Sequence, residues 1–231
     1  MKNPMVVGYK GEIGSFILNG LLRIMPKALD IWCVDVNETD KEVVKRIKAS
    51  DVIFLCVPMD KTIEWMVKYK NQLKGKVIIE QCSLKEWIYD NEDVKGLDIR
   101  SMHILFRPSQ TPNLEDRKVA FFKGQLDVTL EWKISEITQA KVVLYSDAEQ
   151  HDKDMAVLQA VMHRILLVAG NELSGCLGST FISQKVVELE KRIKKGDKEL
   201  YKKIQQNKHL PKQMEEIKKR LDRFDIEDYM K

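Results

Sequence analysis

The chain has 231 residues, of which 44% are hydrophobic, and its formal net charge is +4 at pH 7. This length is enough for one large or two modest domains, and so small a positive excess does not predict binding to nucleic acid. No uninterrupted apolar run approaches the length that a membrane-spanning helix needs, so we expect no membrane segment.

Four cysteines are scattered along the chain and form no Cys-x-x-Cys pair: Cys33, Cys56, Cys82 and Cys176. This spacing predicts neither a disulfide framework nor a zinc site, and it fits a reducing compartment. The first apolar run begins at Met5, which leaves no room for a signal peptide. We therefore expect a cytoplasmic protein without a bound metal.

A glycine-rich turn follows the first apolar run, and helical spacing then continues over residues 15–22. Glycines let a backbone approach phosphate groups, and a helix N-terminus offers them unpaired N–H groups. Compared with the pattern Gly-x-Gly-x-x-Gly, Tyr9 takes the place of the first glycine, and Gly8 comes one position early. A turn that merely starts a helix is the alternative interpretation. The pattern predicts a dinucleotide-binding turn formed by Gly8, Gly11, Glu12, Ile13 and Gly14.

An acidic residue, Asp35, ends a second apolar run at residues 31–34 and lies 21 positions after Gly14. A carboxylate at this place accepts both ribose hydroxyls of NAD and repels the 2′-phosphate of NADP. We therefore expect NAD as the cofactor.

The next hundred residues alternate between strand-like and helical patterns. The continuous apolar run over 52–57, which Pro58 ends, is typical of a strand buried on both faces of a parallel sheet. Ser83 is placed to cap a short helix that runs through Trp87. Further strands are expected at 77–79, 100–106, 119–122 and 141–145, and further helices at 41–49, 59–69 and 132–137. This alternation predicts an α/β fold with a Rossmann-type doubly wound sheet.

No strand-like run recurs after residue 149, and apolar residues follow helical spacing instead. Helices are expected at 151–171, 181–194, 199–207 and from Pro211 onward. We predict two domains: a dinucleotide-binding domain over 1–147, and a smaller all-helical domain over 148–231. Because so small a domain rarely completes a core alone, we expect it to pack on the sheet or to form a homodimer.

Several strings, in order and over nearly the whole chain, resemble the prephenate dehydrogenase family. They are the glycine turn, residues 51–58, the Ser83 turn at 82–85, the His103 motif at 102–106, residues 151–152 with 159–163, and Arg192 with Asp197 and residues 199–201. The resemblance implies oxidative decarboxylation of prephenate to 4-hydroxyphenylpyruvate in tyrosine biosynthesis, with hydride transfer to NAD. It also implies that Val57 and Pro58 contact the cofactor.

The resemblance assigns catalytic roles to two residues of the first domain. His103 would be the base that takes the proton of the substrate hydroxyl, because imidazole titrates near neutrality. Ser83 would hydrogen-bond the same hydroxyl or orient His103. The alternatives are a loop histidine satisfied by backbone groups and a serine that only caps a helix. Ile104 replaces the proline that the family has after this histidine.

In the second domain, the resemblance makes Arg192 a clamp for a substrate carboxylate, since a guanidinium matches a carboxylate with two hydrogen bonds. His163, Gln159 one helical turn earlier, and Tyr201 would also contact substrate. The alternatives are a solvated arginine, a core histidine and a core aromatic residue.

Three other functions remain open. One is oxidation of arogenate, and another is oxidation of a different small anion by an enzyme of the β-hydroxyacid dehydrogenase type. Such enzymes commonly place a catalytic lysine on the long interdomain helix, where this chain has Lys153 near the start and His163 further along. The third is a non-catalytic regulatory dimer that binds NAD.

Overall fold

The computed structural model describes residues 3–25 and 31–224. Its contacts divide the chain into two compact units, Met1–Ala148 and Glu149–Lys231. This division falls one residue beyond the expected boundary. We call the first the sheet unit and the second the helical unit, and describe each by itself.

Five parallel strands form the main sheet of the sheet unit, in the order β2-β1-β3-β4-β5. Their bounds are β1 Pro4–Val7, β2 Trp32–Val34, β3 Val52–Leu55, β4 Val77–Glu80 and β5 Asp98–Ser101. The strand order reverses direction between β1 and β3, and open sheets of this kind bind ligands at the carboxyl ends of the strands beside such a point. The predicted Rossmann-type α/β fold is confirmed.

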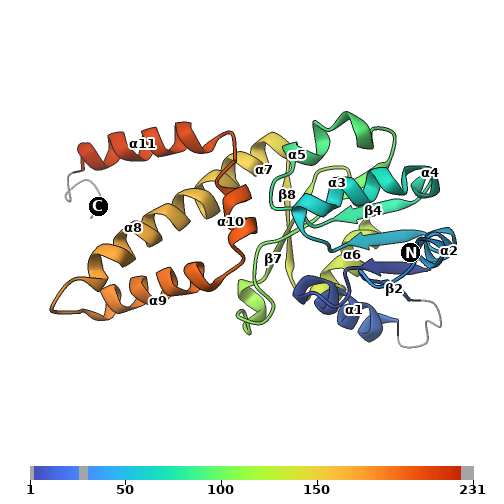
Figure 1. The fold of residues 1–231 in the computed structure, drawn as a ribbon, viewed down its shortest axis with the longest axis horizontal. Coiled ribbons are helices and arrows are strands. Elements are labelled where there is room, and N and C mark those ends of the chain that lie inside the picture. The colour runs from blue at the N-terminus through green and yellow to red at the C-terminus, as the bar shows by residue number, and fades with distance from the viewer. Residues whose placement is uncertain (1–2, 26–30, 225–231) are drawn as a thin grey trace. The chain divides into compact units, whose positions relative to one another are not determined.

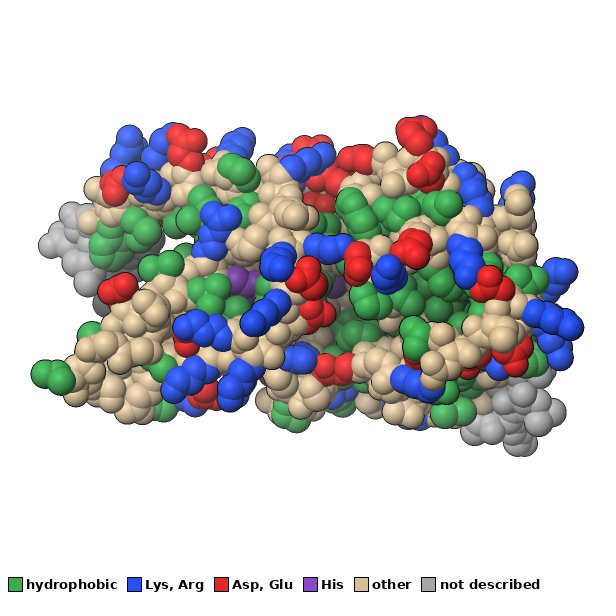
Figure 2. Space-filling view, viewed as in Figure 1, with side chains coloured by type: hydrophobic (Ala, Val, Ile, Leu, Met, Phe, Trp, Pro, Cys, Tyr) green, Lys and Arg blue, Asp and Glu red, His purple; other side chains and the backbone are tan. Residues whose placement is uncertain are grey.

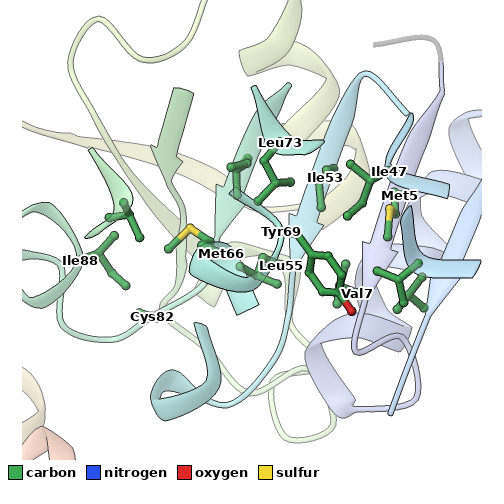
Figure 3. Close-up of a cluster of buried hydrophobic side chains, with 14 of the residues drawn as sticks. Met5, Val7, Ile47, Ile53, Leu55, Met66, Tyr69, Leu73, Cys82 and Ile88 are labelled. Atoms are coloured by element: carbon green, nitrogen blue, oxygen red, sulfur yellow. The ribbon is translucent and has the colours of Figure 1, made fainter. Parts of the chain in front are cut away.

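Helices cover both faces of this sheet (Figure 1). Strand residues alternate in direction, so Val6, Phe54 and Ile79 face one layer. That layer contains α1 (Glu12–Ile24) and α6 (Val128–Thr138). Met5, Ile53 and Ile78 face the opposite layer, which Figure 3 shows in detail. Its helices are α2 (Asp40–Ala49), α3 (Met59–Lys68) and α4 (Lys70–Leu73).

A smaller three-stranded sheet follows, with β6 (His103–Ile104) antiparallel to β7 (Lys118–Phe122) and β8 (Lys141–Tyr145) parallel to β7. The single strand expected over 100–106 is wrong, because the chain changes sheets after Met102. The Met102 N–H still donates to the Glu80 carbonyl at 2.9 Å. The next residue, His103, pairs instead with Ala120 of β7.

The short helix after the Ser83 turn is α5 (Glu86–Tyr89). Its N-cap residue is Lys85, and no side chain caps it, so the expected capping role of Ser83 is wrong. Two single 3₁₀ turns, at Glu92–Val94 and Leu114–Asp116, complete the connections of the sheet unit.

Helices make up the described part of the second unit. They are α7 (Ala148–Met155), a π-helical segment (Ala156–Val161), α8 (Met162–Ser174), α9 (Phe181–Lys195), α10 (Lys198–Ile204) and α11 (Leu210–Asp222). The long helix expected from residue 151 therefore contains a π turn, a feature often found at functional sites. A small core forms around Ala160, Val161, Ile204 and Leu210. Across the described ranges, no helix has the length and apolar character needed to cross a bilayer.

Candidate functional site

Gly8 makes the tight turn at the carboxyl end of β1. Its φ is +77°, a left-handed conformation that favours glycine, and its N–H donates to the Val34 carbonyl at 2.7 Å. A Cβ on Gly8 would lie 2.5 Å from the carbonyl oxygen of Cys56. Gly8 therefore fills the tight-turn role despite its shift by one position. Tyr9, which stands in the pattern's glycine position, packs against the apolar layer around α1.

The next two glycines bring the turn close to the start of α1. The Gly11 N–H donates to the Gly8 carbonyl at 3.1 Å, and a Cβ on Gly14 would overlap that same carbonyl oxygen. Because α1 begins at Glu12, helix geometry leaves the N–H groups of Glu12, Ile13 and Gly14 without carbonyl partners inside the helix. These amides and the positive end of the helix dipole form a site suited to an anion.

Asp35 is joined directly to this turn. The backbone N–H of Lys10 donates to Asp35 Oδ2 at 3.0 Å, and the N–H of Val36 donates to Oδ1 at 2.9 Å. A second carboxylate lies nearby, since Glu38 Oε2 accepts the N–H of Asp35 at 2.7 Å. Two carboxylates at the end of β2 can accept hydrogen bonds from the two hydroxyls of a ribose. Their negative charges would repel a phosphate attached to that ribose.

Glu12, the first residue of α1, holds the loop that follows β6. Arg107 Nε donates to Glu12 Oε2 at 3.0 Å, and the Ser109 N–H donates to Oε1 at 3.1 Å. Partial burial opposes ionisation of Glu12, but the bonds from Ser109 and Arg107 outweigh it and lower the pKa of this carboxyl. The carboxylate therefore remains charged at neutral pH. It holds Arg107 at the first residue of α1.

Val57 and Pro58 follow β3 at the same edge of the sheet. A Cβ on Gly8 would come within 3.4 Å of the Val57 N, so the two segments are in close contact. Pro58 is the N-cap residue of α3. Together the glycine cradle, the free amides of α1 and Asp35 fit a dinucleotide.

A fully buried ion pair lies beneath the neighbouring strand ends. Glu80 is 0% exposed and Lys85 is 1% exposed. Lys85 Nζ donates to Glu80 Oε1 at 2.7 Å and to the Met102 carbonyl at 3.0 Å. Glu80 also accepts from the Ser101 hydroxyl and, at 2.6 Å, from the Cys82 N–H. The pair thus joins the end of β4 to the end of β5.

His103 is the residue directly after the carbonyl that Lys85 holds, and it is 4% exposed. Its backbone is fixed on one side by this bond and on the other by pairing with β7. Ser83 is half-buried in the turn between β4 and α5. Both predicted catalytic residues therefore follow strands at the carboxyl edge of the main sheet.

Two predicted substrate residues meet in the helical unit. The rings of His163 and Tyr201 form an edge-to-face pair with centroids 4.7 Å apart. His163 Nδ1 is buried and has no hydrogen-bond partner, and burial lowers the pKa of this imidazole. His163 is therefore neutral at physiological pH. Gln159 lies in the π-helical segment, four residues before His163.

Arg192 lies on the exposed side of α9. Its Nη2 donates to Glu188 Oε1, one turn earlier on the same helix, at 2.5 Å. The guanidinium of Arg192 is thus paired with a carboxylate of its own helix. A hollow of about 430 Å³ between the C-terminal end of α8 and the first turns of α9 contains Glu188 and Lys191 in its wall.

Two cysteines of the sheet unit, half-buried Cys56 and buried Cys82, are poor nucleophiles. Burial raises the pKa of Cys56 to about 12, and it raises the pKa of Cys82 further. Both remain protonated thiols at neutral pH. Within residues 3–25 and 31–224, no group of three or more His, Cys, Asp or Glu side chains could hold a metal ion.

Three features of this edge were not predicted from the sequence: the Glu80–Lys85 pair, the contact of Arg107 with Glu12, and the unpaired amide of Gln81. One signal was present in the sequence. Residues 80–83 are four consecutive polar or small residues that end an apolar strand, and such residues at a strand end favour a functional edge.

The strand order, the glycine turn and the acidic residue after β2 define a Rossmann-type dinucleotide-binding fold. Among solved structures, a candidate prephenate dehydrogenase from Corynebacterium glutamicum matches with a TM-score of 0.74 at 16% identity. The match covers 96% of this chain and 81% of that chain. The resemblance inferred from the sequence motifs is thus confirmed for the fold.

Two other matches have lower scores. A pyrroline carboxylate reductase from Plasmodium falciparum, solved with NADP bound, has a TM-score of 0.52 at 15% identity, covering 85% of this chain and 80% of that chain. A semialdehyde dehydrogenase NAD-binding protein from Cupriavidus necator, solved with calcium and NAD, has a TM-score of 0.55 at 14% identity, covering 84% and 82%. A scan of protein-family models and a search of curated proteins find no match.

Proposed function

We propose that this chain is an oxidoreductase that uses a nicotinamide dinucleotide, with NAD preferred to NADP. The observation that carries this proposal is the glycine turn, whose cradle and free amides lie next to a carboxylate bonded to Lys10 N–H. The solved structures of similar fold that hold NAD or NADP support it. The preference follows from Asp35 and Glu38, whose charges repel a 2′-phosphate.

We propose further that the substrate is prephenate. The motif resemblance and the Corynebacterium glutamicum structure support this reaction. A nicotinamide ring held by this site would supply the acceptor for a hydride from the carbinol carbon of the substrate. His103 takes the hydroxyl proton on an imidazole nitrogen, and loss of carbon dioxide then produces an aromatic ring. Ser83 donates a hydrogen bond that holds the hydroxyl.

The family resemblance assigns further substrate contacts to residues of the helical unit. Arg192 exchanges Glu188 for a substrate carboxylate, to which it offers two parallel N–H groups. The paired rings of His163 and Tyr201 present an apolar surface with a neutral imidazole nitrogen. Gln159 adds an amide one turn away.

The test is formation of NADH from prephenate by the purified chain, with arogenate and NADP in parallel. His103→Asn should abolish most of the turnover while leaving NAD affinity unchanged. Turnover with arogenate alone would assign the other substrate. NAD binding without turnover on either compound would overturn prephenate as the substrate, in favour of a regulatory NAD-binding protein or an enzyme that oxidises a different small anion. Near-normal turnover by His103→Asn would overturn its role as the base.

We also propose that the helical unit forms a homodimer. Its α8 carries an exposed apolar stripe at helical spacing, with Met162 43% exposed, Ile165 41% and Val168 65%. Exposed hydrophobic side chains of this unit are visible in Figure 2. Sedimentation equilibrium should show a dimer for the wild-type chain and a monomer for Ile165→Glu. Val128→Glu, on an exposed site of the sheet unit, is the matched control and should remain dimeric. A wild-type monomer would contradict the proposal.

A further inference from the structure

Gln81 has a side-chain amide that is buried but has no hydrogen-bond partner. Both of its polar atoms, Nε2 and Oε1, are shielded from solvent and make no hydrogen bond. Buried polar groups in folded proteins are nearly always paired, and an unpaired one costs stability. An amide left in this state is a candidate for a group that gains its partners from a ligand.

The register of the sheet places Gln81 in the row of residues that forms the binding edge. Val7 pairs with Val34 and Leu55, Leu55 pairs with Glu80, and Glu80 pairs with Ser101. The residues one position further along are therefore in one row across the sheet: Asp35, Gly8, Cys56, Gln81 and Met102. Backbone bonds from the N–H of Gly8, Cys56 and Met102 continue this row.

A bound dinucleotide can run along this row in one direction. Asp35, directly after β2, would contact the adenosine ribose, and the glycine turn after β1 would contact the pyrophosphate. The other half of the molecule then extends past β3 toward β4, where Gln81 lies. Three strand spacings, about 14 Å, separate β2 from β4, a span that a whole dinucleotide covers and a mononucleotide does not.

The chemistry of the side chain indicates which group it meets. A primary amide has an acceptor oxygen and two N–H donors, so its closest complement is another primary amide, which pairs with it through two hydrogen bonds. The nicotinamide ring carries such a carboxamide. Prephenate, a dicarboxylate with one hydroxyl, offers few donors to the Oε1 atom.

The backbone on both sides of Gln81 is held in place. Glu80 accepts from Lys85 and Ser101, and its second oxygen accepts the N–H of Cys82 at 2.6 Å. The backbone at Gln81 is thus fixed before a ligand arrives, which lowers the entropy lost on binding.

We propose that the amide of Gln81 recognises the carboxamide of the nicotinamide ring and thereby sets the position of the ring. This inference rests on the proposed function, because it assumes a nicotinamide dinucleotide in the row that Asp35 begins. Gln81 would then bind the complete cofactor but make no contact with its adenosine half.

Calorimetric titrations of wild type and Gln81→Met with NAD and with ADP-ribose, which lacks the nicotinamide, test this. Gln81→Met should weaken NAD binding about tenfold, the loss expected for about two neutral hydrogen bonds. Binding of ADP-ribose should not change. Wild type should also discriminate against the 3-acetylpyridine analogue of NAD, which lacks the amide N–H group, and Gln81→Met should discriminate less.

A thermal melt without ligand shows whether Gln81 contributes to the stability of the folded chain or only to recognition of the ligand. Because Gln81→Met removes an unpaired buried amide, it should melt at or above the wild-type temperature. The control variant Gln184→Met, on an exposed site of α9, should bind both ligands as wild type does.

Three results would overturn the inference. Equal NAD affinity in wild type and Gln81→Met would show that the amide does not contact the carboxamide. Equal loss of NAD and ADP-ribose affinity with a lowered melting temperature would show a structural role. Failure of wild type to bind either ligand would overturn the proposed function itself, and this inference with it.

Discussion

Asp35 is the residue on which the proposed preference for NAD depends. Its carboxylate is oriented by the N–H groups of Lys10 and Val36, and Glu38 adds a second charge nearby. Asp35→Asn removes the charge that repels a 2′-phosphate while keeping an acceptor oxygen. We expect the ratio of NAD to NADP affinity to fall by about tenfold, which corresponds to about 1.4 kcal/mol.

Equilibrium titrations with both cofactors measure this ratio. Asp51→Asn, which changes an exposed carboxylate before the start of β3, is the control and should keep the wild-type ratio. A wild-type chain that prefers NADP would contradict the role of Asp35.

His163 should make stability depend on pH. Burial lowers the pKa of its imidazole, so near pH 6 the unfolded chain binds more protons at this residue than the folded chain does. The free energy of unfolding therefore falls as the pH drops below about 6.5, the usual value for histidine. His163→Gln should lose this part of the pH dependence.

Urea unfolding at about pH 7.5 and about pH 5.5 checks this expectation. These values lie on either side of about 6.5, the pKa of an unperturbed imidazole. The difference in stability between the two pH values should be smaller for His163→Gln than for wild type. Identical differences would show that His163 is not the group responsible.

At the scale of elements, the buried Glu80–Lys85 pair joins β4, β5 and the start of β6. Removing one partner of a buried pair leaves an unpaired charge, and Lys85→Met should lower the free energy of unfolding by about 3–5 kcal/mol. The double variant Glu80→Gln with Lys85→Met should recover most of this loss, because no charge then remains buried.

Chemical denaturation of the single and double variants measures this coupling. Lys61→Met, which breaks the exposed pair with Glu64, should leave stability nearly unchanged. Strictly additive losses for Glu80→Gln and Lys85→Met would contradict the account of a coupled pair.

The helices, strands and site residues that could be predicted from the sequence are those that depend on local patterns. Apolar runs and helical spacing predicted the alternation of the sheet unit, and the glycine spacing predicted the turn and Asp35. The sheet change at Met102 was not predictable, because it depends on a bond to Glu80 on another strand. The contact between Arg107 and Glu12 joins residues 95 positions apart, and Lys85 gives no local sign of its buried partner.

At the scale of the whole molecule, the proposed reaction divides its tasks between two units. The proposal assigns cofactor binding and the base His103 to the sheet unit, and it assigns substrate contacts by Arg192, His163 and Tyr201 to the helical unit. Arg192→Gln should therefore raise the KM for prephenate at least about tenfold, the loss expected for a charge-assisted contact, and leave the NAD affinity unchanged. Lys191→Gln, on the preceding residue of α9, is the matched control for kinetics and calorimetry. An unchanged KM for Arg192→Gln would contradict the clamp.

The central claim is that the glycine turn binds a nicotinamide dinucleotide, and the most direct measurement is calorimetric titration of NAD into wild type and Gly14→Ala. A Cβ at this position would overlap the Gly8 carbonyl, which closes the turn. The account predicts saturable binding of one NAD per wild-type chain and an affinity reduced more than about tenfold in a folded Gly14→Ala variant. Absence of binding to wild type, or equal affinity in the two folded proteins, would contradict it.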